Sequence, residues 1–190
     1  MSTTQQTEAT VLNGINPNDV HDLIATIQAD KTQAMTTWGV TTRWTGGCTT
    51  ETRATEYTIG HRRVAKDFTV RTDEPIDLGG TNTQANPQET LMAAFNACMM
   101  VGYTALCTLN GIRLDYLEID CEGEIDLRGF LGLGKGVKPG YDHLRYTVRI
   151  KGDGTPEQFE QIHQMVMKTS PNRFNIAEAI RLEPQLVVER

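Results

Sequence analysis

Serine is almost absent from this sequence. Ser2 and Ser170 are the two serines among 190 residues, and the G-x-S-x-G pattern of serine hydrolases does not occur, which excludes that class of enzyme. The four histidines are isolated, and neither H-E-x-x-H nor C-x-x-C is found, so we expect no bound metal ion. A G-x-G-x-x-G motif between a strand and a helix is missing as well, and we expect no cofactor.

Basic side chains are also scarce, with 18 lysines and arginines against 24 acidic residues. The resulting net charge of −6 argues against a nucleic-acid partner or an anionic membrane surface. Residues 2–10 are polar and lack the apolar run of a signal peptide, so we expect a cytoplasmic protein. The four cysteines show no paired spacing, which favours reduced thiols over a disulfide framework.

One long apolar stretch, residues 86–111, dominates what the sequence does contain. Asn86 is a good helix N-cap, Glu89 lies where its carboxylate can reach back to that cap, and Gly111 ends the helix. Apart from Glu89 the stretch carries no charge, so the predicted helix should be buried on all sides. Its length approaches that of a membrane span. The amphipathic strands on either side need it as their core, however, and we expect no membrane segment.

The sequence before this helix predicts a polar flexible tail, one helix and three strands. The tail covers residues 1–15, and an amphipathic helix begins after Asn16, with apolar residues at helical spacing up to Ile27. Residues 35–73 read as three strands that are separated by Gly46-Gly47 and by Gly60. In the second strand, alternation places Arg53 on the same face as Tyr57 and Ile59. Arg53 is then either an edge residue that reaches water or a guanidinium aimed at a buried site.

The sequence after the helix predicts a charged hairpin. Acidic side chains alternate with apolar ones from Leu117 to Leu127, and basic side chains alternate in the same way from Tyr141 to Lys151. Antiparallel pairing would place the acidic face beside the basic one, so we interpret these charges as structural. The loop at residues 129–136 nearly matches a phosphate-binding motif, but Gly136 replaces the required hydroxyl and a strand follows.

The last part of the sequence predicts a helix, a short helical turn and a strand. The helix is capped at Thr155 and stops at Ser170-Pro171. A helical turn is expected near residues 176–180 and a strand over residues 182–188. Together these elements indicate a single α+β domain over residues 16–190, in which helices pack on antiparallel sheet. One chain would cover the central helix poorly, which favours a dimer.

The exclusion of serine hydrolases, metal sites and dinucleotide sites leaves thiol chemistry. The candidate thiol is Cys98, near the middle of the central helix. An apolar setting there would leave the thiol inert, and the helix N-terminus is too distant to activate it. A reactive Cys98 therefore needs a cation from elsewhere in the chain, and Arg53 is the candidate that the strand pattern offers.

Several motifs resemble those of the OsmC/Ohr family, and the resemblance runs from about Thr36 to Glu189. They are Asp73-Glu74-Pro75, Leu78-Gly79-Gly80, Pro87-x-Glu89 with the alanine-rich helix around Cys98, residues 122–133, Pro139-Gly140-Tyr141 and Ser170-Pro171. The resemblance implies an intertwined homodimer and a thiol peroxidase that reduces organic hydroperoxides or hydrogen peroxide in oxidative stress defence. It places the peroxidatic cysteine at Cys98 and a thiolate-stabilising arginine at Arg53, with Arg43 and Arg71 as weaker matches. It also assigns Glu89 the role of orienting that arginine.

One position departs from the peroxidase pattern. Ser170 stands where the peroxidase branches of the family carry a resolving cysteine, so the usual intramolecular disulfide cannot form. The resemblance then implies a one-cysteine cycle that depends on an external thiol, unless Cys48 resolves it from a distance. The alternatives are a non-catalytic protein that binds a small apolar ligand and a redox sensor.

Overall fold

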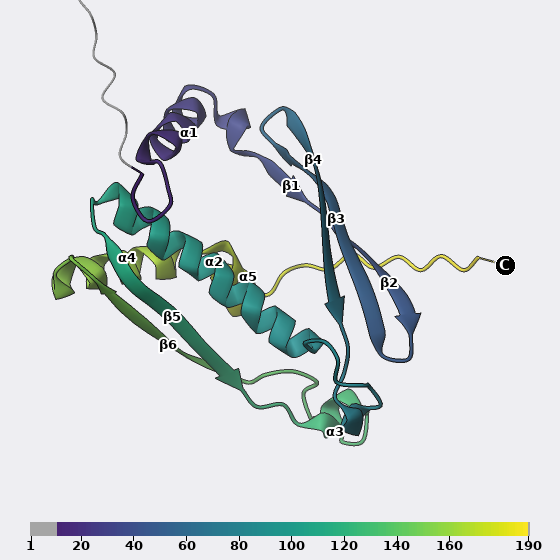
Figure 1. Cartoon of the computed structure of the whole chain (residues 1–190). Coiled ribbons are helices and arrows are strands. Elements are labelled where there is room, and N and C mark those ends of the chain that lie inside the picture. The colour runs from purple at the N-terminus through teal and green to yellow at the C-terminus, as the bar shows by residue number, and fades with distance from the viewer. Residues whose placement is uncertain (1–10, 190) are drawn as a thin grey trace, which may run out of the picture. The chain divides into compact units, whose positions relative to one another are not determined.

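The computed structural model describes residues 11–189. The contacts divide the chain into two compact units, residues 1–93 and 94–190, and each is described by itself. Most of the predicted tail lies outside the described residues, but Leu12 and Ile15 are joined by two backbone hydrogen bonds of 2.9 Å. The prediction of one domain over residues 16–190 stays a prediction. Figure 1 labels the α-helices and β-strands of both units.

The first unit contains a capped helix and a four-stranded antiparallel sheet. Its elements are α1 (Pro17–Ala29), the short helix η1 (Lys31–Ala34), and the strands β1 (Thr36–Trp38), β2 (Thr41–Gly46), β3 (Thr49–Ile59) and β4 (Arg62–Thr72). The predicted cap of α1 is confirmed, because the Asn16 side chain accepts a hydrogen bond from the Asn18 backbone amide. Gly47 and Gly60 have φ values of 53° and 54°, which explains the turns predicted at these glycines.

β3 lies at the centre of this sheet, with β4 on one side and both β1 and β2 on the other. The predicted first strand is therefore two strands. Trp38 pairs with Tyr57 but Thr41 pairs with Arg53, so the register with β3 changes by one residue across the break. The β3–β4 register changes in the same region, between Ala54 and Glu56. Because of these register changes, alternation alone does not show that Arg53 lies on the same face as Tyr57, and the sequence-based argument for that placement fails.

Neutral hydroxyl pairs connect the strands of the first unit. Thr42 and Thr52 approach to 2.8 Å between their Oγ1 atoms, and Thr50 and Thr72 approach to 2.7 Å. Both are cross-strand neighbours in the observed register. Each such pair contributes modestly to the cohesion of the sheet.

A buried carboxylate organises the loop between β4 and the central helix. Asp73 is fully buried, and its Oδ2 atom accepts hydrogen bonds from the backbone amides and the hydroxyls of Thr81 and Thr83. These bonds, the Thr81 hydroxyl first, hold the pKa of the Asp73 carboxyl well below its usual range. The backbone amide of Asp73 also donates to Ala85, so the loop is closed at both ends.

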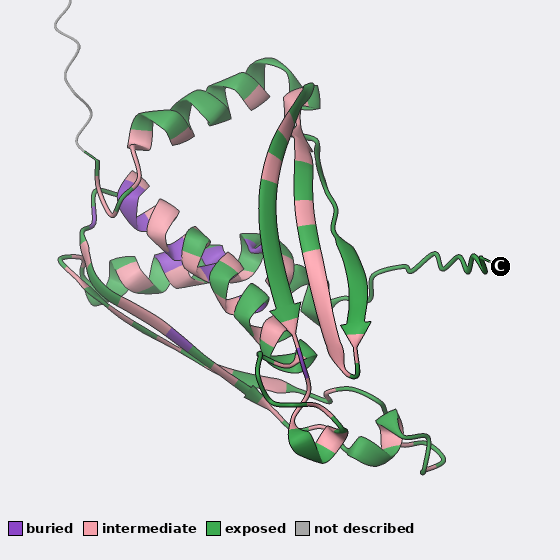
Figure 2. Cartoon of the chain, turned by 45° about the vertical axis from the view of Figure 1, so that its right-hand side comes forward, coloured by how far each residue is buried: buried purple, intermediate pink, exposed green. Residues whose placement is uncertain are grey.

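The central helix α2 (Pro87–Leu109) begins as the sequence predicts. The Asn86 side chain accepts from the Glu89 amide and the Glu89 carboxylate accepts from the Asn86 amide, both at 2.8 Å. Burial follows one stripe at a spacing of four residues: Phe95, Met99, Tyr103 and Cys107 (Figure 2). Other faces stay open, with Val101 67% exposed, so burial on all sides is not achieved within the described chain. The helix has the length and hydropathy of a membrane span, a property that the core helices of soluble proteins share.

The second unit places a two-stranded sheet and two further helices against α2. Its other elements are β5 (Leu114–Gly123), α3 (Leu127–Phe130), β6 (Leu144–Gly152), α4 (Pro156–Thr169) and α5 (Pro171–Ala177). The predicted charged hairpin is confirmed: Glu118 pairs with Arg149 and Glu122 with Arg145 in the antiparallel register. Their ion pairs measure 3.1 and 3.0 Å, which supports a structural role for these charges.

Three details of the second unit correct the sequence-based predictions. β5 ends at Gly123 because Asp126 caps α3, so Ile125 and Leu127 leave the strand. The short helical turn expected at residues 176–180 begins earlier, as α5, because Ser170 caps it and Pro171 suits its first position. Residues 178–189 form neither helix nor strand, so the last predicted strand is wrong for the described chain.

The helices α2 and α4 approach closely. The capping box at Thr155 and Gln158 starts α4 as predicted, and Ile162 and Val166 form its buried stripe. A Cβ atom added to Gly102 would lie 3.3 Å from a methyl carbon of Val166, a tight contact, so glycine permits this close approach without a shift of Val166. The core of the second unit forms around this contact, with Met99 and Val166 both fully buried.

Candidate active site

Cys98 and Ser170 meet in the second unit, although they are 72 positions apart in the sequence. The Ser170 hydroxyl donates a hydrogen bond to the Cys98 sulfur, with 3.5 Å between Oγ and Sγ. Ser170 is buried at 6% exposure, and Cys98 is half-buried. The sulfur is therefore not surrounded by hydrocarbon alone, because a polar donor from the α4–α5 junction reaches it.

Two further hydrogen bonds fix this junction. Asn172 donates from its side chain to the Ala94 carbonyl of α2 at 2.9 Å, one turn before Cys98. Arg173 donates from its guanidinium to the Met167 carbonyl of α4, also at 2.9 Å. The first turn of α5 is thus tied to both neighbouring helices, and Ser170 cannot move away from Cys98 without breaking these contacts.

The other cysteines lie in different surroundings. Cys107 is fully buried, and burial raises the pKa of its thiol. Burial also raises the pKa of Cys121, as expected for an inert core thiol. In the first unit, Cys48 lies 3.8 Å from the Leu78 carbonyl oxygen. A role for Cys48 as a distant resolving thiol stays a hypothesis.

Two of the three candidate arginines share one carboxylate in the first unit. Arg53 donates from Nε to Glu51 at 3.0 Å, and Arg71 donates from Nη2 to the other oxygen of Glu51 at 2.9 Å. Arg43 lies directly opposite Glu51 in the β2–β3 register. The bonds from Arg53 and then Arg71 lower the pKa of Glu51. The Glu51 carboxylate is thus paired with two guanidinium groups, one on β3 and one on β4.

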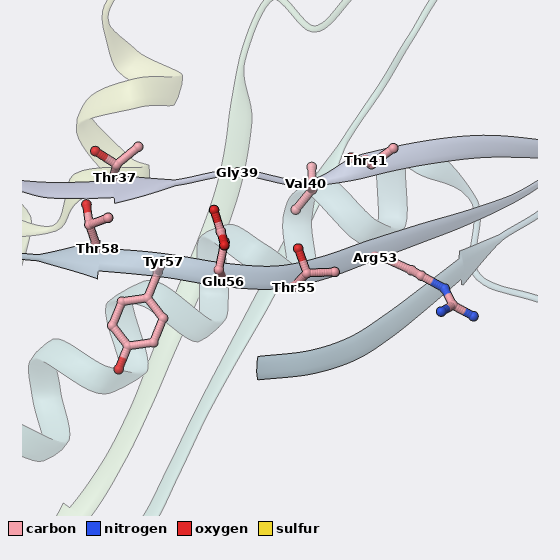
Figure 3. Close-up of a pocket in the computed structure, with 9 residues that line it drawn as sticks. All are labelled: Thr37, Gly39, Val40, Thr41, Arg53, Thr55, Glu56, Tyr57 and Thr58. Atoms are coloured by element: carbon pink, nitrogen blue, oxygen red, sulfur yellow. The ribbon is translucent and has the colours of Figure 1, made fainter. Parts of the chain in front are cut away.

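Arg53 also lines a shallow hollow of about 270 Å³ beside the break between β1 and β2. Figure 3 shows its side chain extending from β3 at one end of this hollow, near Val40 and Thr55. Because Glu51 engages the Nε edge, the two terminal nitrogens of Arg53 remain available for another acceptor. Glu89, the remaining predicted site residue, uses its carboxylate to cap α2. A further role in orienting Arg53 remains a prediction.

The sequence analysis missed a polar pair beneath a groove in the second unit. Tyr103 is almost fully buried, and its hydroxyl lies 2.5 Å from Nδ1 of His163. Burial raises the pKa of Tyr103 to about 12. The two residues line a groove of about 460 Å³, together with Tyr146, Val148, Ile150, Pro156, Phe159 and Glu160. Helical spacing alone would have placed Tyr103 in the core, and nothing in the sequence pairs it with His163.

Comparisons with known proteins give the family from one family model and the fold from solved structures. A family model described as OsmC-like protein matches residues 80–185, more than half of the chain. A crystal structure of an OsmC-like protein from Mycoplasma pneumoniae matches with a TM-score of 0.55 at 12% identity, over 74% of this chain and 87% of that one. A protein from Psychrobacter arcticus 273-4, named for osmotic stress induction and a detoxification response, matches with a TM-score of 0.51 at 15% identity, over 74% and 88%. No curated protein matches the chain.

Proposed function

The chain belongs to the OsmC-like protein family, and on that premise we propose that it is a one-cysteine thiol peroxidase of oxidative stress defence, with Cys98 as its nucleophile. The substrate is an organic hydroperoxide or hydrogen peroxide, and an external thiol is the reductant. The observation that carries this proposal is the contact between Cys98 and Ser170. A hydroxyl lies beside Cys98 where the peroxidase branches of the family carry the resolving sulfur, so an external thiol is the reductant that we assign to the cycle.

The proposed reaction has two stages. The Cys98 thiolate attacks one peroxide oxygen, the O–O bond breaks, and Cys98 becomes a sulfenic acid while the departing alkoxide takes a proton from water. An external thiol then condenses with the sulfenic acid, which releases water and leaves a mixed disulfide. A second external thiolate attacks the outer sulfur, which regenerates the Cys98 thiolate and yields the oxidised disulfide of the reductant.

Positive charge is the second requirement, since an uncompensated thiolate in an apolar setting is costly. We assign this charge to Arg53, which would stabilise both the thiolate and the departing oxygen through its terminal nitrogens. The cluster around Glu51 supports this assignment because it keeps a guanidinium extended on β3. Glu89 would contribute by orienting Arg53 in addition to capping α2.

A homodimer and a cytoplasmic location belong to the same proposal. The open faces of α2, with Val101 67% exposed, support a partner chain that covers this helix. A cytoplasmic location would supply the reduced thiols that a one-cysteine cycle consumes.

Peroxide consumption by the purified protein tests the proposal. Purified protein is mixed with cumene hydroperoxide or hydrogen peroxide and an excess of dithiothreitol, and peroxide loss is followed for wild type, Cys98→Ser and Cys107→Ser. We expect Cys98→Ser to abolish consumption and Cys107→Ser, a change on the same helix, to preserve it. Equal consumption by wild type and the Cys98 variant would refute the proposal.

A second candidate function rests on the groove above Tyr103 and His163. Val148, Ile150 and Phe159 line part of this groove of about 460 Å³ and would contact a small apolar ligand, with Cys98 acting only as a structural or redox-sensing residue. This candidate predicts no turnover of peroxide. It also predicts saturable binding of an apolar dye such as Nile red, which Tyr146→Ala or Phe159→Ala would weaken.

A further inference from the structure

Ser170 lies at the junction between α4 and α5. Its backbone amide donates to the Val166 carbonyl at 2.9 Å and so ends α4, while its hydroxyl oxygen accepts from the Arg173 amide at 3.5 Å and so begins α5. The same hydroxyl reaches the Cys98 sulfur at 3.5 Å. One side chain therefore caps a helix and contacts the sulfur of the candidate nucleophile.

The direction of the hydroxyl proton follows from this arrangement. A serine hydroxyl has one proton to donate and two lone pairs to accept with. Because the oxygen already accepts from Arg173, the proton is available for the sulfur. A thiolate is a far better acceptor than a thiol, so this hydroxyl binds a charged sulfur more strongly than a neutral one.

The hydroxyl also has little freedom to turn elsewhere. Ser170 is buried, and the side chains of Asn172 and Arg173 anchor α5 to the carbonyls of Ala94 and Met167. Its donor is thereby held in a constant direction with respect to α2. A donor that needs no rearrangement is the kind that stabilises charge most effectively.

We propose that Ser170 is a positioning residue for Cys98, whose hydroxyl holds the sulfur in the orientation and charge state that attack on a peroxide requires. This inference rests on the proposed function, because it concerns the reactivity of the same sulfur. Ser170 acts only through Cys98 and exchanges no electrons. The sequence alone presents Ser170 merely as a missing resolving cysteine, whereas the contact gives it a positive role.

The test compares Ser170→Ala with Ser170→Thr and with Thr169→Ala. Thr169 loses a hydroxyl in the same turn, but that hydroxyl bonds to the Met165 carbonyl and not to a sulfur. Two quantities are measured: the rate constant for Cys98 oxidation by cumene hydroperoxide, and the pH profile of Cys98 alkylation by iodoacetamide, read by mass spectrometry. We expect Ser170→Ala to slow oxidation about tenfold, roughly the loss of one weak charge-assisted hydrogen bond, and to move the alkylation profile towards higher pH. Ser170→Thr should restore most of the oxidation rate and most of the wild-type alkylation profile. Thr169→Ala should change neither the rate nor the profile.

Each contrary result has a separate meaning. An unchanged rate and profile in Ser170→Ala would overturn the inference. A slower rate without a shift in the profile, or without rescue by threonine, would reduce Ser170 to a helix cap and overturn it equally. If wild-type Cys98 fails to react with any peroxide, the proposed function fails, while the alkylation profile still decides whether Ser170 tunes the sulfur.

Discussion

Replacing Ser170 by cysteine should give Cys98 a neighbouring thiol with which it can form a disulfide. The Ser170 oxygen and the Cys98 sulfur are 3.5 Å apart, and a disulfide bond is about 2.05 Å long. The two atoms must therefore approach by about 1.5 Å, and the longer carbon–sulfur bond of the new side chain supplies part of this. We expect Ser170→Cys to form an intramolecular disulfide with Cys98 on mild oxidation.

The size of the effect follows from the separation in sequence. The new bond would close a loop of 72 positions, and loop-closure entropy predicts that oxidation stabilises the fold by about 4 kcal/mol, less any strain. Unfolding of Ser170→Cys in urea, with and without dithiothreitol, measures this difference. Intact mass, non-reducing electrophoresis and peptide mapping identify the bond.

Thr169→Cys is the matched control, because its side chain is exposed and points to the Met165 carbonyl. Under the same conditions, Thr169→Cys should leave Cys98 and the introduced cysteine as free thiols. A disulfide in the control but not in Ser170→Cys, or two free thiols in both, would show that the α4–α5 junction does not face Cys98. That result would remove the main support for the proposed site.

Three further predictions concern the scaffold. The pKa of the Asp73 carboxyl in the folded state lies below its ordinary value of 3.8, so the ionised carboxylate stabilises the fold above that pH and this contribution is lost as the pH falls. Asp73→Asn should therefore be less stable than wild type at neutral pH, and its stability should depend less on acid. Acid titrations followed by circular dichroism measure both effects. Met99→Ala should lower the free energy of urea unfolding by about 2–5 kcal/mol because Met99 is fully buried, whereas Met165→Ala at a 46% exposed position should change it little. Thr155→Ala removes one side of a capping box and should cost about 1 kcal/mol in the same assay, with Thr155→Ser restoring most of it.

Local signals in the sequence predicted the elements whose causes are local. The capping boxes at Asn86 and Thr155 begin helices as expected, since the residues that form them are three positions apart. The charged hairpin was predictable because alternating acids and bases demand one antiparallel register. The last strand was predicted wrongly because alternation over residues 182–188 reports which side chains are apolar but not what they pair with.

Contacts between distant positions set the limits of the prediction for the site. The resemblance selected Cys98 and noted Ser170, but the hydrogen bond between them depends on how α4 packs on α2. The common partner of Arg53 and Arg71 became visible only with the strand register, because no sequence motif links either arginine to Glu51. The pairing of Tyr103 with His163 likewise joins two helices whose relative rotation the sequence does not specify.

The side-chain links between strands differ in the two sheets, and this has a consequence for the solution behaviour of the protein. Threonine hydroxyls link β2, β3 and β4 alongside the ion pairs of Arg71 with Glu51 and Arg63 with Glu56, whereas exposed carboxylates and guanidinium groups link β5 to β6. Added sodium chloride screens the ion pairs of both sheets and leaves the threonine pairs almost untouched. High ionic strength should therefore increase amide exchange more in the β5–β6 hairpin than along the threonine pairs of the first sheet.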